Sequence, residues 1–453
     1  MTPLPTMTEQ HPEAAEQGPA LKPGSIAVTG QTALKGNVTV GGSVRASLAL
    51  LALAALRPRP VTITGVPVSA HTEQASTLMQ IVGCAVKRGQ GGEITVTGPA
   101  AAADLAHHAA PPDLFNALGR APAAVYLIPA FLRAHGYAAQ PWPQEPLEQV
   151  LEIYKEFGDT IETSTVGFSI VAAAASPAVV EITMATREPA PTITAVLRAC
   201  TGGSRIVLHH PSRAPEVHAL HAALKRLGWN GRLGDERLEL EPGETPWPTL
   251  TWAVPGDELE AAACVCALAA TRGSGTVSGV STRHLTVLRM LLGHAGVRVT
   301  LTREQVKVER AIGAPRSGRS GLAFGAGPAP RDLPSQQLAL LLPVALGVPG
   351  RHRLSDPAFP ARLETIARQL RAFGVPVDTV REPGRAVHIN SSLLAAPRAS
   401  LEAADPADAM ALVITGLAAR GTTRIRRIGH LHHSHPGLLP HLRDLGAQIA
   451  GGV

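Results

Sequence analysis

The chain repeats one pattern of apolar and polar positions six times. In each copy an amphipathic helix ends at a glycine and a strand follows. Glycine suits this place because it readily adopts the left-handed conformation that closes a helix. These glycines, spaced 68–78 residues apart, are Gly83, Gly158, Gly228, Gly296, Gly374 and Gly446.

A second helix precedes each amphipathic helix and is apolar around its whole circumference. Examples are RASLALLALAAL at 45–56 and ELEAAACVCALAA at 258–270. Such helices are typically buried in the centre of a domain. Each unit therefore reads strand, buried helix, strand, surface helix and two strands. The period is longer than that of common solenoid repeats, so the pattern predicts a few compact α+β subdomains.

Composition narrows the function classes. With 45% hydrophobic and 17% charged residues, the chain is typical of a globular protein. Its four cysteines are spaced like neither a disulfide framework nor a zinc site. We expect no transmembrane helix and no nucleic-acid surface, because apolar runs are short and no basic block is interleaved with aromatics. Residues 1–20 lack an apolar signal core, so we expect a disordered tail on a cytoplasmic protein.

The repeat and several segments resemble the enolpyruvyl transferases, or 1-carboxyvinyltransferases. The branch that acts on UDP-N-acetylglucosamine looks most similar, and the shikimate-3-phosphate branch fits less well. The resemblance implies an α+β fold, a two-domain inside-out α/β barrel of six βαβαββ units with three units per domain. The segments that carry it are SIAVTGQTALKGNVTVGGSVRASLALLALAAL, SRAPEVHALHAALKRLG, PGDELEAAACVCALAA and DLPSQQLA.

The resemblance also implies domain boundaries and a reaction. Residues 36–243 would form the N-terminal domain, and residues 21–35 with 244–453 the C-terminal domain. The family moves an enolpyruvyl group from phosphoenolpyruvate to a UDP-N-acetylglucosamine hydroxyl in peptidoglycan precursor synthesis. The implied partners are small molecules, a nucleotide sugar and an anionic donor. We expect no cofactor, no membrane partner, and a monomer or weak homo-oligomer.

Three features that the family uses on phosphoenolpyruvate are altered here. The family's lysine after the first strand aligns with Val44, and the arginine of the last unit with Ala407, beside Asp408. The loop that carries the family's acid is replaced by the proline-rich residues 140–146. Charged contacts to a transferring group are worth several kcal/mol, so these changes predict weakened or lost activity.

Three residues are candidates for the remaining chemistry. Arg45 either replaces the lysine from one position further on or is solvated, and we favour the solvated state because a displaced arginine seldom reproduces the geometry. Arg120, one residue out of register with a family arginine, either reaches the site or is solvated. The resemblance assigns the catalytic aspartate to Asp257, but Asp257 and Glu260 also fit a helix capping box.

The last two units offer weaker candidates. Ser335 and Gln336 replace a polar pair of the family, and Asp356 lies near one of its acidic positions. A histidine-rich loop at 430–441 includes the weak metal candidates His430, His432, His433 and His435. Imidazoles bind zinc, copper and nickel. Because no acid or cysteine accompanies them at regular spacing, we favour an exposed, solvated loop. Protonation of its histidines would give this loop a positive charge that binds anions.

Three functions stay open from the sequence. The first is a transferase that uses Arg45, Arg120 and Asp257. The second is a non-catalytic paralogue that binds a nucleotide sugar or a partner protein. The third is an enzyme with another substrate, either of the shikimate-3-phosphate type or one that uses the histidine loop.

Overall fold

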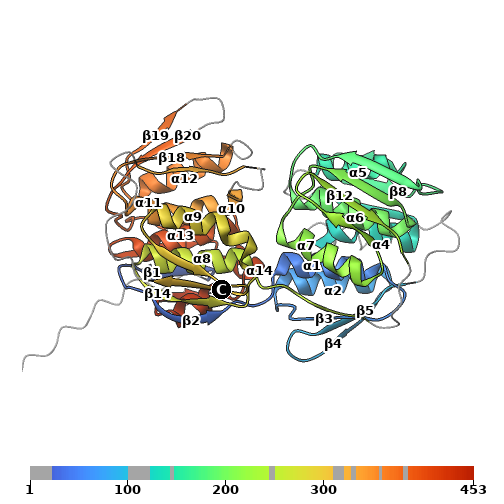
Figure 1. The fold of residues 1–453 in the computed structure, drawn as a ribbon, viewed down its shortest axis with the longest axis horizontal. Helices are drawn as coiled ribbons and strands as arrows, with labels where there is room; N and C mark the ends of the chain where they lie inside the picture. Colours follow the sequence, from blue (N-terminus) through green and yellow to red (C-terminus); the bar gives the residue numbers. More distant parts are fainter. Residues whose placement is uncertain are drawn as a thin grey trace, which may run out of the picture.

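The computed structural model shows two lobes side by side (Figure 1). Residues 26–40 and 259–449 supply the core of the C-terminal lobe, and residues 44–252 supply the core of the N-terminal lobe. The expected tail at 1–20 lies outside the described residues. The structure describes residues 23–99, 123–142, 147–243, 250–309, 321–327, 333–356, 360–380 and 386–452.

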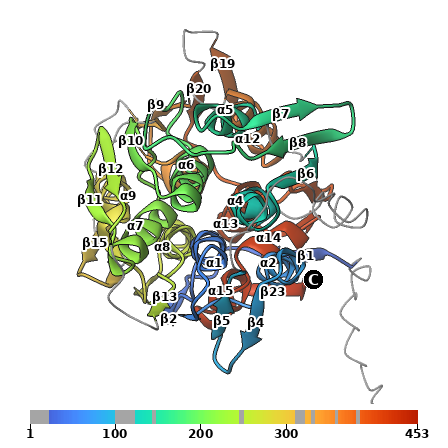
Figure 2. The ribbon, with the colours of Figure 1, turned by 90° about the vertical axis from the view of Figure 1, so that its right-hand side faces the viewer.

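Apolar helices occupy the centre of the N-terminal lobe, as the repeat predicts. They pack against one another, with amphipathic helices outside them (Figure 2). Burying their apolar surface is the main stabilising contribution. The inner helices are α1 (Val44–Ala55), α4 (Ala123–His135) and α6 (Pro189–Gly202). The outer helices are α2 (Ala70–Val82), α5 (Glu148–Glu156) and α7 (Pro215–Arg226).

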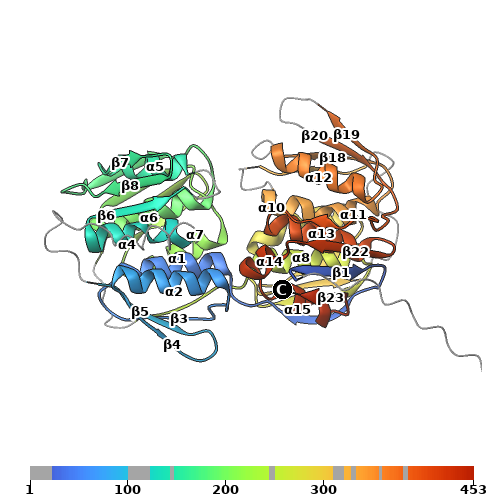
Figure 3. The same ribbon diagram turned by 180° about the vertical axis from the view of Figure 1, so that it is seen from behind.

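The C-terminal lobe repeats this arrangement, with α14 on the side that faces the other lobe (Figure 3). The inner helices are α8 (Glu258–Ala270), the run α10 (Ser335–Leu338), η2 (Ala339–Leu341) and α11 (Leu342–Leu346), and α13 (Pro406–Ala418). The others are η1 (Thr282–Leu285), α9 (Thr286–His294), α12 (Pro360–Ala372), α14 (Gly429–Ser434) and α15 (Leu438–Asp444).

Small sheets cover the helices, one for each repeat unit. In the N-terminal lobe the described strands pair as β13 (Leu250–Ala253), β3 (Val61–Thr64), β5 (Ile94–Thr97), β4 (Ala85–Arg88); β6 (Tyr137–Pro141), β8 (Gly167–Val171), β7 (Thr160–Thr163); and β11 (Asn230–Leu233), β12 (Arg237–Glu241), β10 (Arg205–His209), β9 (Val179–Thr183). In the C-terminal lobe they pair as β15 (Arg298–Leu301), β16 (Gln305–Glu309), β14 (Ser274–Ser278), β2 (Lys35–Thr39); β17 (Ala323–Gly325), β18 (Arg351–Ser355), β20 (Ala386–Asn390), β19 (Val377–Val380); and β21 (Leu401–Glu402), β22 (Thr422–Arg426), β1 (Ser25–Thr29), β23 (Gln448–Gly452).

Two strands complete the sheets of units that are distant in the sequence. β2 pairs in parallel with β14, and β13 pairs in parallel with β3. Their inward-facing side chains, Val38 and Trp252, are buried in the cores of these lobes. We expected the chain to cross near Gly36 and return near Gly243. The pairings correct both positions, because the chain crosses after β2 and returns after β13.

The glycines that the repeat singled out all end helices in the predicted way. Their φ angles are 102° at Gly83, 80° at Gly158, 85° at Gly228, 83° at Gly296, 81° at Gly374 and 93° at Gly446. All lie in the left-handed region that favours glycine. Across the described ranges no helix combines the length and the apolarity needed to span a membrane.

Candidate functional site

The two segments that join the lobes run antiparallel beside each other. Gly42 and Gly256 form a β-bridge there. A Cβ atom on Gly42 would lie 2.1 Å from the Gly65 carbonyl oxygen, and one on Gly256 would lie 1.8 Å from that of Gly279. Both positions therefore require glycine. We call these two segments, residues 40–43 and 254–257, the hinge.

The first inner helix of the N-terminal lobe, α1, begins at the hinge. Ser43 caps it and accepts a hydrogen bond from the Ala46 N–H at 3.3 Å. Val44 is only 2% exposed and packs in the core of this lobe. Arg45 points elsewhere, and its Nη1 donates to Oε1 of Gln336, across the junction on α10, at 2.9 Å. The favoured expectation of a solvated Arg45 is wrong, since this half-buried side chain links the lobes.

The inner helix α8 of the other lobe also begins at the hinge. Its cap, Asp257, is 4% exposed, and its Oδ1 accepts hydrogen bonds from the N–H groups of Leu259 and Glu260, both at 3.0 Å. The other oxygen, Oδ2, lies 2.8 Å from Nδ1 of His435. Only half of the expected capping box forms, because the Glu260 carboxylate binds His441 instead.

The histidine-rich segment is not the exposed loop that we expected. It forms α14 and α15, and His435 between them is 2% exposed. The expectation failed because the partner of His435, Asp257, lies 178 residues away in the sequence. Among the described residues, no group of three or more His, Cys, Asp or Glu side chains is placed to hold a metal ion.

Histidine rings from opposite lobes meet at two places. His71 on α2 lies 5.8 Å from His433 on α14, and His218 on α7 lies 5.1 Å from His284 on η1, between ring centroids. Burial lowers the pKa of all four, for His218 to about 4 and for His284 to about 3. At neutral pH the rings of His218 and His284 are therefore uncharged.

Carboxyl groups gather at the start of α8. Burial raises the pKa of Glu216, Glu258 and Glu260. The charges of Glu216 and Asp257 raise that of Glu258 further. For Asp257 burial acts in the same direction, but His435 and the Glu260 N–H outweigh it and lower the pKa. A cluster of carboxyl groups whose pKa values are shifted in opposite directions is more common at functional sites than elsewhere.

The fifth unit places its candidate residues at the same junction. Ser335 Oγ donates to Oδ1 of the fully buried Asp356 at 3.1 Å, and the adjacent Gln336 accepts from Arg45. The structure thus brings Arg45 and Gln336 together and pairs Ser335 with Asp356. Arg120 lies outside the described residues.

The last unit places Ala407 and Asp408 at the start of an inner helix, α13. Ala407 is 8% exposed in the first turn of α13. Asp408 accepts a hydrogen bond from the Ala404 N–H at 2.7 Å and another from Gln369. Burial raises the pKa of Asp408. The Asp408 carboxyl group therefore takes part in the local structure at the start of this helix.

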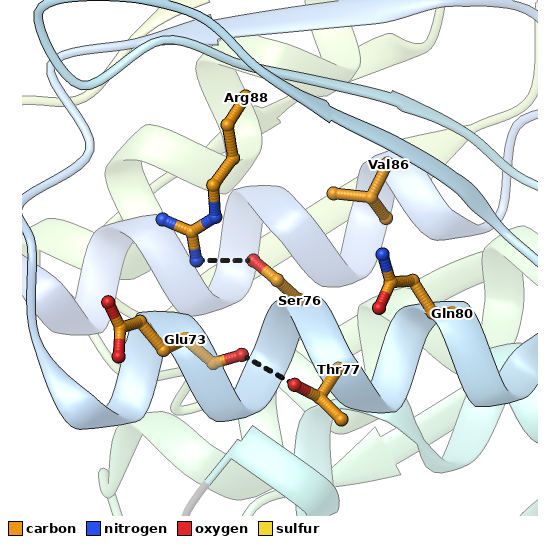
Figure 4. Close-up of a pocket in the computed structure, with 6 residues that line it drawn as sticks. All are labelled: Glu73, Ser76, Thr77, Gln80, Val86 and Arg88. Carbon is orange, nitrogen blue, oxygen red and sulfur yellow. Dashed lines mark hydrogen bonds between the residues drawn. The ribbon is translucent and has the colours of Figure 1, made fainter.

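A surface cavity lies between α2 and the strand β4 (Figure 4). Its volume is about 380 Å³. Arg88 reaches over it and donates to the Ser76 hydroxyl at 3.1 Å. No residue predicted for the site lines it, since its lining consists of Glu73, Ser76, Thr77, Gln80, Val86 and Arg88.

Comparisons with known proteins agree with this architecture. Residues 28–442 match the family model described as EPSP synthase (3-phosphoshikimate 1-carboxyvinyltransferase). UDP-N-acetylglucosamine 1-carboxyvinyltransferase from Sphingopyxis alaskensis is 26% identical over 434 residues, which cover 94% of this chain and 98% of the relative. The protein of the same name from Trichlorobacter lovleyi is 26% identical over 436 residues, with the same coverage.

Two solved structures share the fold. The enolpyruvyl transferase NikO from Streptomyces tendae superposes with a TM-score of 0.79 at 22% identity, over 94% of this chain and 99% of its own. EPSP synthase from Acinetobacter baumannii gives a TM-score of 0.67 at 15% identity, over 95% of this chain and 100% of its own. The predicted enolpyruvyl transferase fold is thereby confirmed.

Proposed function

The chain belongs to the EPSP synthase family of 1-carboxyvinyltransferases, and from this premise we propose that it resembles the UDP-N-acetylglucosamine enzymes in its acceptor. It would bind a nucleotide sugar at the junction of the lobes and transfer an enolpyruvyl group to it slowly. We place this chemistry in peptidoglycan precursor synthesis in the cytoplasm, without a cofactor. The names of the relatives support the acceptor class.

The position of Val44 supports the second half of the proposal, which is the slow transfer of the enolpyruvyl group. In the family this position supplies a lysine to phosphoenolpyruvate. Here the side chain is a hydrocarbon packed in the core of the N-terminal lobe. Arg45, the adjacent cation, already donates to Gln336, and its charge acts on Glu216 and Glu258. A phosphate would compete with these groups for the guanidinium, which weakens donor binding.

The junction still offers groups that suit a polar acceptor. Asp257, Ser335 and Gln336 lie at the starts of inner helices of the C-terminal lobe, and Asp356, which directly follows β18, accepts a hydrogen bond from Ser335. Hydroxyl-rich ligands need acceptors and donors of this kind, held in fixed positions. We propose Asp257, Arg45, Gln336, Ser335 and Asp356 as binding or catalytic residues, and Arg120 as a further substrate contact.

Phosphate release tests the proposal directly. Purified protein is mixed with phosphoenolpyruvate and UDP-N-acetylglucosamine, and free phosphate is followed beside one of the relatives. Loss of one preorganised charge contact typically costs about 10²- to 10³-fold in rate, so we expect at least that deficit. A rate equal to that of the relative would contradict the weakened donor site. Shikimate-3-phosphate in place of the nucleotide sugar tests the other branch of the family.

A further inference from the structure

Asp257 and His435 form a buried pair with a defined polarity. The Asp257 oxygen Oδ1 is held by two backbone N–H groups, which leaves Oδ2 for the imidazole at 2.8 Å. Because the carboxylate accepts, Nδ1 of His435 carries the ring proton and donates it. The tautomer with its proton on Nδ1 presents the lone pair of Nε2 on its other side.

The Nε2 atom of His435 is buried without a hydrogen-bond partner among the described residues. A buried polar atom of this kind has a free-energy cost unless something binds to it. His435 also lies near the other lobe. Burial lowers the pKa of His71, on the first turn of α2, and charges on His433, His430 and His435 lower it further. His435 directly follows α14, which packs against α2 of the other lobe, so it lies close to the surface where the two lobes meet.

From this geometry we propose that His435 Nε2 accepts the proton of the acceptor hydroxyl, with Asp257 as the residue that positions and polarises the ring. This proposal rests on the proposed function and specifies its proton-transfer group. The arrangement is that of a general base, in which the carboxylate fixes the tautomer and the distal nitrogen takes the proton.

The step balances with the family reaction. The hydroxyl oxygen forms a bond to C2 of phosphoenolpyruvate while its proton moves to Nε2, and the C3 methylene takes a proton from a solvent hydronium ion. In the elimination that follows, C3 returns a proton to solvent water and the bond from C2 to the phosphate oxygen breaks. His435 then gives its proton to the departing phosphate. The products are the enolpyruvyl ether and hydrogen phosphate, and the ring returns to its neutral form.

Nitrogen-15 NMR of histidine-labelled full-length protein tests the hydrogen bond. We expect His435 to show the Nδ1–H tautomer, and its Nε2 resonance to shift when UDP-N-acetylglucosamine is added. The Asp257→Asn variant keeps an oxygen for the helix cap but turns an amide N–H toward Nδ1. This variant should switch His435 to the Nε2–H tautomer and abolish the shift caused by the nucleotide sugar, and the loss of that shift is a signature that a purely structural role would not give.

Phosphate release supplies the second readout. His435→Gln should lower kcat by about 10²-fold and leave KM for UDP-N-acetylglucosamine within about threefold. His441→Gln is the matched control, because His441 binds Glu260 at the same corner of the lobe and should leave kcat within about threefold. Thermal unfolding of each variant verifies that it is folded.

The outcomes separate the two proposals. Binding of the nucleotide sugar, measured by its heat, without a change at His435 would overturn the role of His435 and leave the proposed function standing. A kcat of His435→Gln equal to that of the unaltered protein would do the same. Absence of both heat and spectral change would overturn the proposed function, and the role of His435 with it.

Discussion

Two helices begin at the same hinge, and their first turns have opposite character. The start of α1 has a serine cap, an apolar residue in the core and no acid in its first turn. The start of α8 has an aspartate cap and two glutamates, and histidines bind its carboxylates. The difference indicates that carboxyl groups are concentrated at the start of α8, while the first residue of α1, Val44, belongs to the hydrophobic core of its lobe.

The start of α1 mainly stabilises its lobe, whereas the start of α8 mainly holds ionisable groups. In α1 the hydrocarbon at Val44 contributes to the core of its lobe. In α8 the same turn buries ionisable groups, and burying a charge costs free energy unless it is paired. The pairing of Asp257 with His435 compensates that cost. Buried groups of shifted pKa are more common at functional sites than elsewhere, so the contrast supports the proposed site at the start of α8.

The largest expected effect comes from the two helix caps. Asp257→Ala removes two capping hydrogen bonds and leaves His435 buried without its partner. We expect the free energy of unfolding to fall by about 3–5 kcal/mol, the range for one half of a buried pair. Ser43→Ala removes only a cap and should cost about 1 kcal/mol. Urea unfolding measures both, and equal losses would contradict the contrast between the helices.

The hinge glycines come next. Gly42→Ala and Gly256→Ala each force a Cβ against a backbone carbonyl oxygen, and we expect losses of about 1–3 kcal/mol or more. Gly41→Ala is the control, because its Cβ would meet nothing within 4 Å and should change stability by less than about 0.5 kcal/mol. If Gly41→Ala were as harmful as its neighbour in urea unfolding, the tight hinge would be refuted.

The histidine contacts between the lobes give a pH effect of intermediate size. Both His218 and His284, with pKa values of about 4 and about 3, bind protons less readily when folded than at their ordinary value of 6.5. The unfolded chain therefore binds more protons, and the free energy of unfolding falls as pH falls from 6.5 toward 4. Replacing both by Gln should flatten this dependence, whereas the same change at exposed His432 should not. An unchanged dependence of the free energy of unfolding on pH in the double variant would contradict the assignment of this effect to His218 and His284.

The smallest stability effect is expected at the contact between α1 and α10. Arg45→Ala removes one half-buried hydrogen bond to Gln336 and should cost about 1 kcal/mol in urea unfolding. Its larger consequence should be weaker binding of the nucleotide sugar, measured by calorimetry. Gln336→Ala removes the other half of the contact and serves as the matched variant. Unaltered ligand binding in both would remove Arg45 from the proposed site.

The repeat was predictable from sequence because its signals are local. Helix periodicity and a terminal glycine are read within about a dozen residues, and every predicted glycine has the left-handed conformation. The crossings were misplaced because β2 and β13 look like strands of their own units. Their pairing with β14 and β3 depends on partners more than 180 residues away, which no local pattern records.

The site was less predictable for the same reason. Asp257 was singled out through the family resemblance, with helix capping as the alternative, but its partner His435 was assigned to an exposed loop. The direction of the Arg45 side chain, toward Gln336 and away from solvent, depends on how the lobes meet. The acids Glu216 and Glu258 were missed entirely, because at helix starts they look like ordinary favourable charges and only burial reveals their raised pKa.

Calorimetric titration with UDP-N-acetylglucosamine, in the absence and presence of phosphoenolpyruvate, tests most directly whether the acceptor side survives while the donor side is weakened. We predict binding of the nucleotide sugar with an affinity that phosphoenolpyruvate leaves nearly unchanged. A marked gain in affinity with phosphoenolpyruvate would show an intact donor site and contradict the account, as would the absence of any heat from the nucleotide sugar.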